Sequence, residues 1–159
     1  MLSQNKYKKI FIYTILGIYL IVTVFCLFYK RNYIWSNASI KEYFLQFTNF
    51  VPFRTINQTI AVYFQTDNLR KLRPLLYHLV ILIFPGLVYG VCAKSHTGIK
   101  NQLYILIVRF FPLLCAVYLT RMLLKMGSFD IDDILLNLVG LAIGAAVALK
   151  VKRILTPIK

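Results

Sequence analysis

The sequence predicts an all-α integral membrane protein with four transmembrane helices and a long interfacial or re-entrant segment between the first and the second. Hydrophobic residues make up 59% of the 159 residues, compared with about 45–50% in an ordinary soluble domain. The mean hydropathy is +0.68. The apolar residues gather in four runs, each close to the roughly 20 residues that cross a bilayer core. Basic residues flank these runs, as they flank membrane spans.

The four spans are predicted at about 10–29, 75–93, 103–124 and 131–151, within one domain covering 1–159. The first apolar run is long and no small-residue cleavage site follows it, so it is interpreted as an uncleaved anchor and not as a signal peptide. The Pro85-Gly86 pair in the second span predicts a break or kink, because proline cannot donate a backbone hydrogen bond.

The segment 30–74 is too long for a simple connection between two spans. It is rich in aromatic residues, whose amphipathic rings favour the headgroup level of a membrane. We expect one or two short interfacial or re-entrant helices in it, at about 39–47 and 55–65.

The charge balance points to a membrane and not to nucleic acid. The chain has 19 bases and five acids, a formal net charge of +14. The bases lie mostly at the ends of apolar runs and form no separate basic and aromatic tract, so nucleic acid is not an expected partner and membrane lipids are. With both termini in the cytoplasm, nine bases face inward and eight outward, a small difference under the positive-inside rule.

A polar stripe in the fourth span is the most informative feature of the sequence. Asp130, Asp133, Asn137, Gly140 and Gly144 follow one another at spacings of 3, 4, 3 and 4 residues, which places them on one face of a helix. Acidic groups at membrane depth are costly. The stripe is therefore expected to face protein or water, and it locates a candidate site.

The two acids of this stripe have three open interpretations. Asp130 and Asp133 could cap the fourth helix and meet its favourable N-terminal dipole. They could form a polar cluster with Arg121 or Arg109 that holds the third and fourth helices together. Lastly, the carboxylates could join neighbouring polar groups to bind a divalent ion, or a lipid-linked phosphate through such an ion.

Four other polar residues complete the set of tentative ligand-binding residues. Asn137 and His78 could join the carboxylates, although a single histidine is usually a hydrogen-bonded packing residue. Arg54 could meet a lipid phosphate, which arginine binds bidentately, or lie at the headgroup level as an ordinary base. Arg121 could likewise meet an anionic group, or its side chain could extend to the headgroup level as long basic side chains near span ends do. No metal site and no cofactor are assigned.

Small residues in the fourth span predict close helix packing. Gly140, Gly144 and Ala148 recur every four residues, a pattern that lets helix backbones approach each other in membranes. The partner is a helix of the same chain or of a second copy, so a homo-oligomer through the fourth helix is one expectation. The three cysteines lie in apolar runs without paired spacing and are interpreted as buried fillers.

Three elements of the sequence resemble the VanZ-like family of bacterial membrane proteins. Pro52-Phe53-Arg54-Thr55-Ile56 is similar to the family's Pro-Phe-x-Thr-Ile element. Phe84-Pro85-Gly86 is similar to its Phe-x-Pro-x-Gly turn, with the first two residues shifted by one. The acidic stripe from Asp130 to Gly144 resembles its most distinctive stretch at full spacing. The resemblance covers most of residues 45–150.

The chain departs from the family pattern at two places. His78 stands where the family usually has Asn, and the third span lacks the family's Glu and Gln, three residues apart, in the stretch from Tyr118 to Met122. Arg121 in this stretch reverses the local charge. If the family's Glu has a role with a proton, a metal or a substrate, this chain has lost the role or given it to another group.

The resemblance implies a multi-pass protein of the bacterial plasma membrane with a role in the cell envelope. The expected function is to bind a lipid-linked or amphiphilic envelope molecule and to lower susceptibility to glycopeptides of the teicoplanin type. Two alternatives stay open: a membrane-lipid-modifying enzyme with Asp133 as base or metal ligand, or a small transporter or assembly subunit. No nucleophile elbow, phosphate loop or HExxH motif occurs in the sequence, so no catalytic residue is assigned.

Overall fold

The structure is a computed structural model that describes residues 39–93 and 98–155 continuously. It also describes residues 7, 10, 14, 15, 17–19, 21–23, 25 and 37 individually. The first predicted span, 10–29, falls in the part described only at individual residues, so the prediction of four spans stays a prediction. The elements in chain order are α2 (Ile40–Phe47), β1 (Thr48–Asn49), α3 (Arg54–Thr66), η2 (Leu69–Leu72), α4 (Arg73–Ile81), α5 (Ile83–Cys92), α6 (Ile99–Leu123), β2 (Phe129–Asp130) and α7 (Ile131–Leu155).

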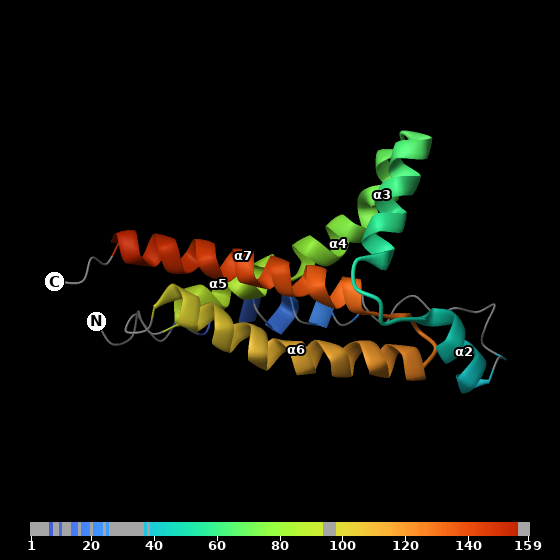
Figure 1. The fold of residues 1–159 in the computed structure, drawn as a ribbon. Helices are drawn as coiled ribbons and strands as arrows, with labels where there is room; N and C mark the ends of the chain where they lie inside the picture. Colours follow the sequence, from blue (N-terminus) through green and yellow to red (C-terminus); the bar gives the residue numbers. More distant parts are fainter. Residues whose placement is uncertain are drawn as a thin grey trace.

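Three stretches of helix are long and apolar enough to cross a membrane. They cover Leu69–Cys92, Ile99–Leu123 and Ile131–Leu155, and they correspond to the second, third and fourth predicted spans. Helices α5, α6 and α7 run alongside one another, while α3 stands away from this bundle at the end where α7 begins (Figure 1). The prediction of a mostly helical chain is confirmed.

The second long stretch is broken, although not at the proline itself. Helix α4 ends at Ile81, Leu82 takes a non-helical conformation, and α5 begins at Ile83. Pro85 cannot donate to the carbonyl four residues before it, which belongs to Ile81, and its ring crowds that carbonyl. The Tyr19 hydroxyl donates to the Ile81 carbonyl instead. The break therefore lies one turn before Pro85, and a side chain from the N-terminal region satisfies the freed group.

The two short helices expected between the first and second spans are both present as α2 and α3. At the start of α2 the Ser39 hydroxyl accepts from the Glu42 amide, and the Ser39 amide donates to the Glu42 carboxylate at 2.8 Å, which is a capping box. This bond from the Ser39 backbone holds the pKa of Glu42 below its ordinary value of 4.5. The interfacial or re-entrant placement of α2 and α3 stays a prediction.

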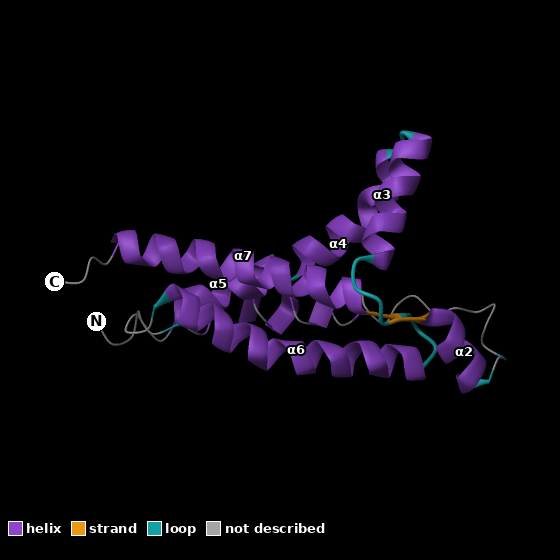
Figure 2. Ribbon diagram, in the orientation of Figure 1, coloured by secondary structure: helices purple, strands orange, loops and turns teal. Residues whose placement is uncertain are grey.

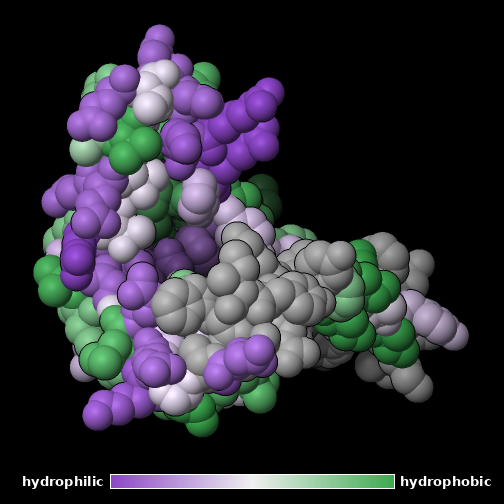
Figure 3. Space-filling model, turned by 90° about the vertical axis from the view of Figure 1, so that its right-hand side faces the viewer, coloured by the Kyte–Doolittle hydropathy of each residue, from purple (hydrophilic) through white to green (hydrophobic). Residues whose placement is uncertain are grey.

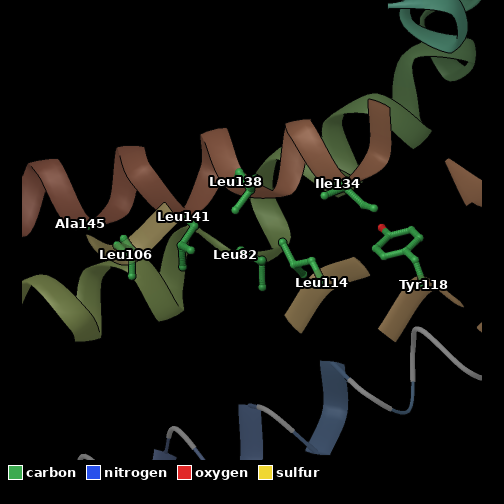
Figure 4. Close-up of a cluster of buried hydrophobic side chains, with 8 residues drawn as sticks. All are labelled: Leu82, Leu106, Leu114, Tyr118, Ile134, Leu138, Leu141 and Ala145. Atoms are coloured by element: carbon green, nitrogen blue, oxygen red, sulfur yellow. The ribbon is translucent and has the colours of Figure 1, made fainter. Parts of the chain in front are cut away.

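The hydrophobic core lies between α6 and α7, and α4 and α5 cover it. Leu106, Tyr118, Ile134, Leu141 and Ala145 are fully buried there. Figure 4 shows these side chains converging from α6 and α7, with Tyr118 at one end of the cluster and its hydroxyl turned toward α7. The core thus ends in a polar group at the end of the bundle where α7 begins.

Glycines bring α7 into backbone contact with α4 and α5. A Cβ added at Gly140 would overlap the Leu79 carbonyl oxygen, and one added at Gly144 would overlap that of Ile83. Gly86 on α5 is equally close to the Leu141 carbonyl. Such contact is possible only without side chains, so the small residues of α7 pack within this chain.

Candidate functional site: buried carboxylates and a polar pocket at the end of the bundle

Two short strands join distant parts of the chain at the end of the bundle. β1 and β2 are parallel, with Thr48 paired with Phe129 and Asn49 with Asp130 (Figure 2). The pairing places the segment that leads into α3 directly beside the segment that leads into α7. The acidic turn before α7 therefore meets the Pro-Phe-x-Thr-Ile element before α3.

Asp130 is the centre of a hydrogen-bond cluster at this junction. Its side chain is almost fully buried and accepts from the Asn49 amide at 3.1 Å and from the Thr55 hydroxyl at 2.5 Å. It also accepts from the backbone N–H of Asp132 at 2.9 Å, as a residue that caps a helix does. Asp130 therefore caps α7 and, in addition, binds the two segments on either side of the turn into α3.

Asp132 is a site residue that the sequence analysis missed. Its carboxylate is 0% exposed and accepts three backbone N–H groups, from Phe53 at 2.5 Å, Thr55 at 2.8 Å and Ile56 at 3.2 Å. These N–H groups lie at the start of α3, where backbone donors have no partner within the helix. Asp132 thus anchors α3 to α7. Arg54 lies between two of the residues that Asp132 holds, Phe53 and Thr55, and its side chain is exposed.

No pattern in the sequence singles out Asp132. Its position in α7 lies beside the stripe on which the other polar residues recur, and its partners are more than 70 residues earlier in the chain. In the structure, Phe53 adopts a left-handed conformation with φ of 65°. Such a conformation is unusual for a bulky residue, and here it presents successive N–H groups to the carboxylate.

A polar pocket of about 400 Å³ opens next to Asp130. We call it the end pocket. Its lining consists mainly of amide, hydroxyl and charged side chains: Leu45, Gln46, Phe47, Thr48, Asn49, Arg54, Thr55, Gln58, Ser128, Phe129 and Asp130. Figure 3 views this end of the molecule and shows a recess among hydrophilic residues. Arg54, which is exposed, is the only cation among the lining residues that the structure describes.

The remaining predicted polar residues meet deeper in the bundle. The Asn137 amide donates to the Tyr118 hydroxyl at 2.8 Å, and that hydroxyl lies 2.9 Å from His78 Nδ1. On the other side of the imidazole ring, His78 Nε2 lies 3.4 Å from an Asp133 carboxylate oxygen. Tyr118 is the second residue that the sequence analysis missed as part of a site. We call these four residues the polar chain, and they come from α4, α6 and α7.

The two arginines of the third span make no ion pair with a carboxylate, and all five carboxylates belong to the described residues. Arg121 lies with its guanidinium 5.1 Å from the centre of the Tyr118 ring, and its buried Nε has no hydrogen-bond partner there. Arg109 is exposed. Arg121 is therefore the positive charge that faces the polar chain, and it contacts the chain through the face of the Tyr118 ring.

The structure thus divides the predicted site residues into two neighbouring groups. Arg54 and Asp130 line the end pocket, whereas His78, Asp133 and Asn137 belong to the polar chain. Among the residues that the structure describes, no group of three or more histidine, cysteine or acidic side chains is arranged to hold a metal ion. The chemistry that the site offers is hydrogen bonding, one exposed cation and proton transfer.

Gly140, Gly144 and Ala148 form the wall of α7 that faces α4 and α5. A Cβ at Gly90 on α5 would lie 2.6 Å from the Cβ of Ala148. This face is therefore occupied within the chain. The face of α7 that stays exposed carries Val139 and Val147, which are 49% and 50% exposed, and an oligomer through the fourth helix would use that face.

Long apolar helices that pack through small residues and bury a set of connected polar side chains define a helical membrane protein. Comparison with protein families identifies it further: the model of the VanZ/LLP1 family matches residues 16–154, nearly the whole chain. The protein belongs to this family. No curated protein and no solved structure matches the chain. Membership supports a VanZ-type cell-envelope protein, in a family linked to glycopeptide resistance.

Proposed function

We propose that this protein binds a lipid-linked or amphiphilic molecule of the bacterial cell envelope in the end pocket, and thereby lowers susceptibility to teicoplanin-type glycopeptides. The observation that supports the proposal most directly is the pocket itself. It combines one exposed cation, Arg54, with amide and hydroxyl groups from four segments of the chain. Such a lining suits a hydroxylated headgroup that carries a phosphate or carboxylate.

The surroundings of the pocket suit the apolar part of the same molecule. Phe50 and Phe53 lie at the turn into α3 and are 62% and 59% exposed, and the Phe50 ring centre is 5.3 Å from that of Phe129, which lines the pocket. A ligand with its headgroup in the pocket would find apolar surface for its chain beside it. Exposed apolar residues around a polar recess are typical of a ligand-binding or membrane-contacting surface.

The proposal places the protein in the plasma membrane with both termini in the cytoplasm. Lys150, Lys152 and Arg153 lie at the C-terminal end of α7, the opposite end of the bundle from the pocket (Figure 1). The positive-inside rule favours a cytoplasmic position for this end, by the small margin of nine bases to eight. The end pocket then faces the outer surface, where envelope precursors and glycopeptides meet.

The experiment that tests the function is a susceptibility assay in a Gram-positive host that expresses the chain. Teicoplanin and vancomycin inhibitory concentrations are measured for the wild type, Arg54→Gln and Arg70→Gln, at matched abundance in the membrane. Arg70 is an exposed base that does not line the pocket, so Arg70→Gln is the matched control. We expect protection by the wild type and the control and its loss in Arg54→Gln. Absence of protection in the wild type would overturn the proposed function.

Binding is tested separately with purified protein. Native mass spectrometry in the presence of a polyprenyl phosphate should show a bound adduct for the wild type and for Arg70→Gln. Arg54→Gln should bind at least tenfold more weakly, because removing one partner of a charge-assisted hydrogen bond costs about 1.5–3 kcal/mol. Equal binding by all three forms would remove Arg54 and the end pocket from the proposal.

A further inference from the structure

The polar chain has a direction that hydrogen-bond chemistry defines. The Asn137 Nδ2 group can only donate, so the Tyr118 oxygen accepts from it. The Tyr118 hydroxyl proton is then directed to His78 Nδ1, which must be unprotonated to accept it. The ring proton of a neutral His78 consequently sits on Nε2 and faces the Asp133 carboxylate. Every bond in this arrangement points from Asn137 toward Asp133.

The same four residues can support the opposite direction. Asn137 is 2% exposed, and its Oδ1 has no hydrogen-bond partner. Turning the amide by half a rotation would let Oδ1 accept the Tyr118 hydroxyl and would leave Nδ2 unpaired instead. Each direction therefore leaves one buried amide atom of Asn137 without a hydrogen-bond partner. Because the number of hydrogen bonds that Asn137 makes is the same in both, Asn137 favours neither direction.

Reversal requires one additional proton, because a neutral His78 with its only proton on Nδ1 would turn an unprotonated Nε2 toward the Asp133 carboxylate. When the Tyr118 hydroxyl donates to Asn137, its oxygen must accept from His78, so His78 Nδ1 has to carry a proton. That proton, together with the one already on Nε2, makes two protons shared by His78 and Asp133. The pair changes from a carboxylate and a neutral imidazole, with charge −1, to a pair with no net charge. One proton enters, and no other reactant is needed.

We infer that His78 and Asp133 form a proton-binding site and that proton uptake reverses the hydrogen bonds through Tyr118 to Asn137. This site is independent of the ligand proposed for the end pocket. The side chains of His78 and Asp133 are 12% and 15% exposed, so the site is open to the outside of the helix bundle. Tyr118 and Asn137 are buried in the core, with exposed fractions of 0% and 2%, so the reversal extends from His78 into the interior of the bundle.

The charged and titratable groups around the site come from all the elements packed against it. Asp130 and Asp132 lie at the N-terminal end of α7, and their negative charge favours uptake. Arg121 on α6 opposes it, and Tyr77 on α4 lies edge-on to the His78 ring. Because the bonds that reverse connect α4, α6 and α7, proton binding acts on the contacts among these helices.

The experiment is nitrogen-15 NMR of the purified full-length protein, labelled at histidine and asparagine, in detergent micelles. The chain has two histidines, His78 and His96, so His96→Gln leaves a single labelled ring. Nδ1 of His78 is expected to be unprotonated at high pH and protonated at low pH, while the Asn137 side-chain amide signal shifts over the same range. An Nδ1 that keeps one protonation state wherever the protein stays folded would overturn the inference without any further variant.

Three substitutions in this background identify the members of the site. Asp133→Asn removes the partner charge and should lower the proton affinity of His78 at least tenfold. Tyr118→Phe removes the acceptor for the Nδ1 proton and should also lower it. Tyr104→Phe is the matched control, because Tyr104 lies on α6 like Tyr118 but is 66% exposed and outside the polar chain, and it should leave the titration unchanged. Proton uptake that is equal in Asp133→Asn and the wild type would refute the shared site.

Discussion

Substitution of Gly144 by alanine is the sharpest test of how α7 packs. An added Cβ would overlap the Ile83 carbonyl oxygen, and it would lie only 2.9 Å from the Ile83 carbonyl carbon and from the Leu87 amide nitrogen. All of these are backbone atoms, so no side-chain rotation relieves the overlap. The two helices must move apart, and the loss extends along the interface between α5 and α7.

The size of the effect follows from two opposing contributions. Overpacking usually costs about 1–3 kcal/mol, and a backbone overlap belongs at the upper end of that range, about 3 kcal/mol. About 1 kcal/mol of this cost is offset, because alanine has a higher helix propensity than glycine. The expected net loss in the free energy of unfolding is about 2 kcal/mol, or roughly thirtyfold in the equilibrium constant.

The assay is unfolding in mixtures of dodecylmaltoside and SDS, followed by far-ultraviolet circular dichroism. Gly98→Ala is the matched control, since a Cβ at Gly98 would meet no atom within 4 Å. Gly144→Ala should unfold at a clearly lower SDS fraction than the wild type, and Gly98→Ala close to it. If Gly144→Ala were as stable as the control, α7 would not be in backbone contact with α5, and the account of the small-residue stripe would be wrong.

Two further predictions concern the segment between the first two spans. Asp132→Asn should release the start of α3 from α7, because an amide oxygen cannot replace a carboxylate that accepts three backbone N–H groups. We expect the free energy that holds the start of α3 in place to fall by about 2–4 kcal/mol, seen as faster hydrogen exchange of the Thr55 and Ile56 amides. Unchanged exchange would argue against this role of Asp132. Because the pKa of Glu42 is lowered from 4.5, its carboxylate stabilises the α2 cap fully above that value, and the contribution is lost as pH falls through the lowered pKa. A carbon-13 titration of Glu42 with a midpoint at or above 4.5 would contradict this.

Much of the helical framework could be predicted from local patterns. The expected helix at 39–47 corresponds to α2, and the expected span at 131–151 begins at the same residue as α7. Apolar runs of span length are a property of neighbouring residues, which is why sequence alone indicates them. The break in the second span could be anticipated as well. Its position at Leu82 follows from the Ile81 carbonyl, which receives no backbone hydrogen bond because Pro85 has no N–H.

The candidate site was predictable only in part, for a different physical reason. Asp130, Asp133 and Asn137 could be grouped because helical periodicity relates them within one segment. His78 could be proposed to join them from its residue type alone, whereas Tyr118 was missed. Both come from other helices, and nothing local specifies which of their faces meet.

The sequence by itself therefore determined that this is a helical membrane protein with a costly acidic stripe that must face protein or water. Only the tertiary structure decided what satisfies each acid. Asp132, which lies beside the stripe, is paired with the start of α3, and Asp133 is paired with His78 and not with an arginine. A buried charge takes whichever donors helix packing brings within hydrogen-bond distance. That packing depends on glycines that contact the backbone of helices far away in the chain.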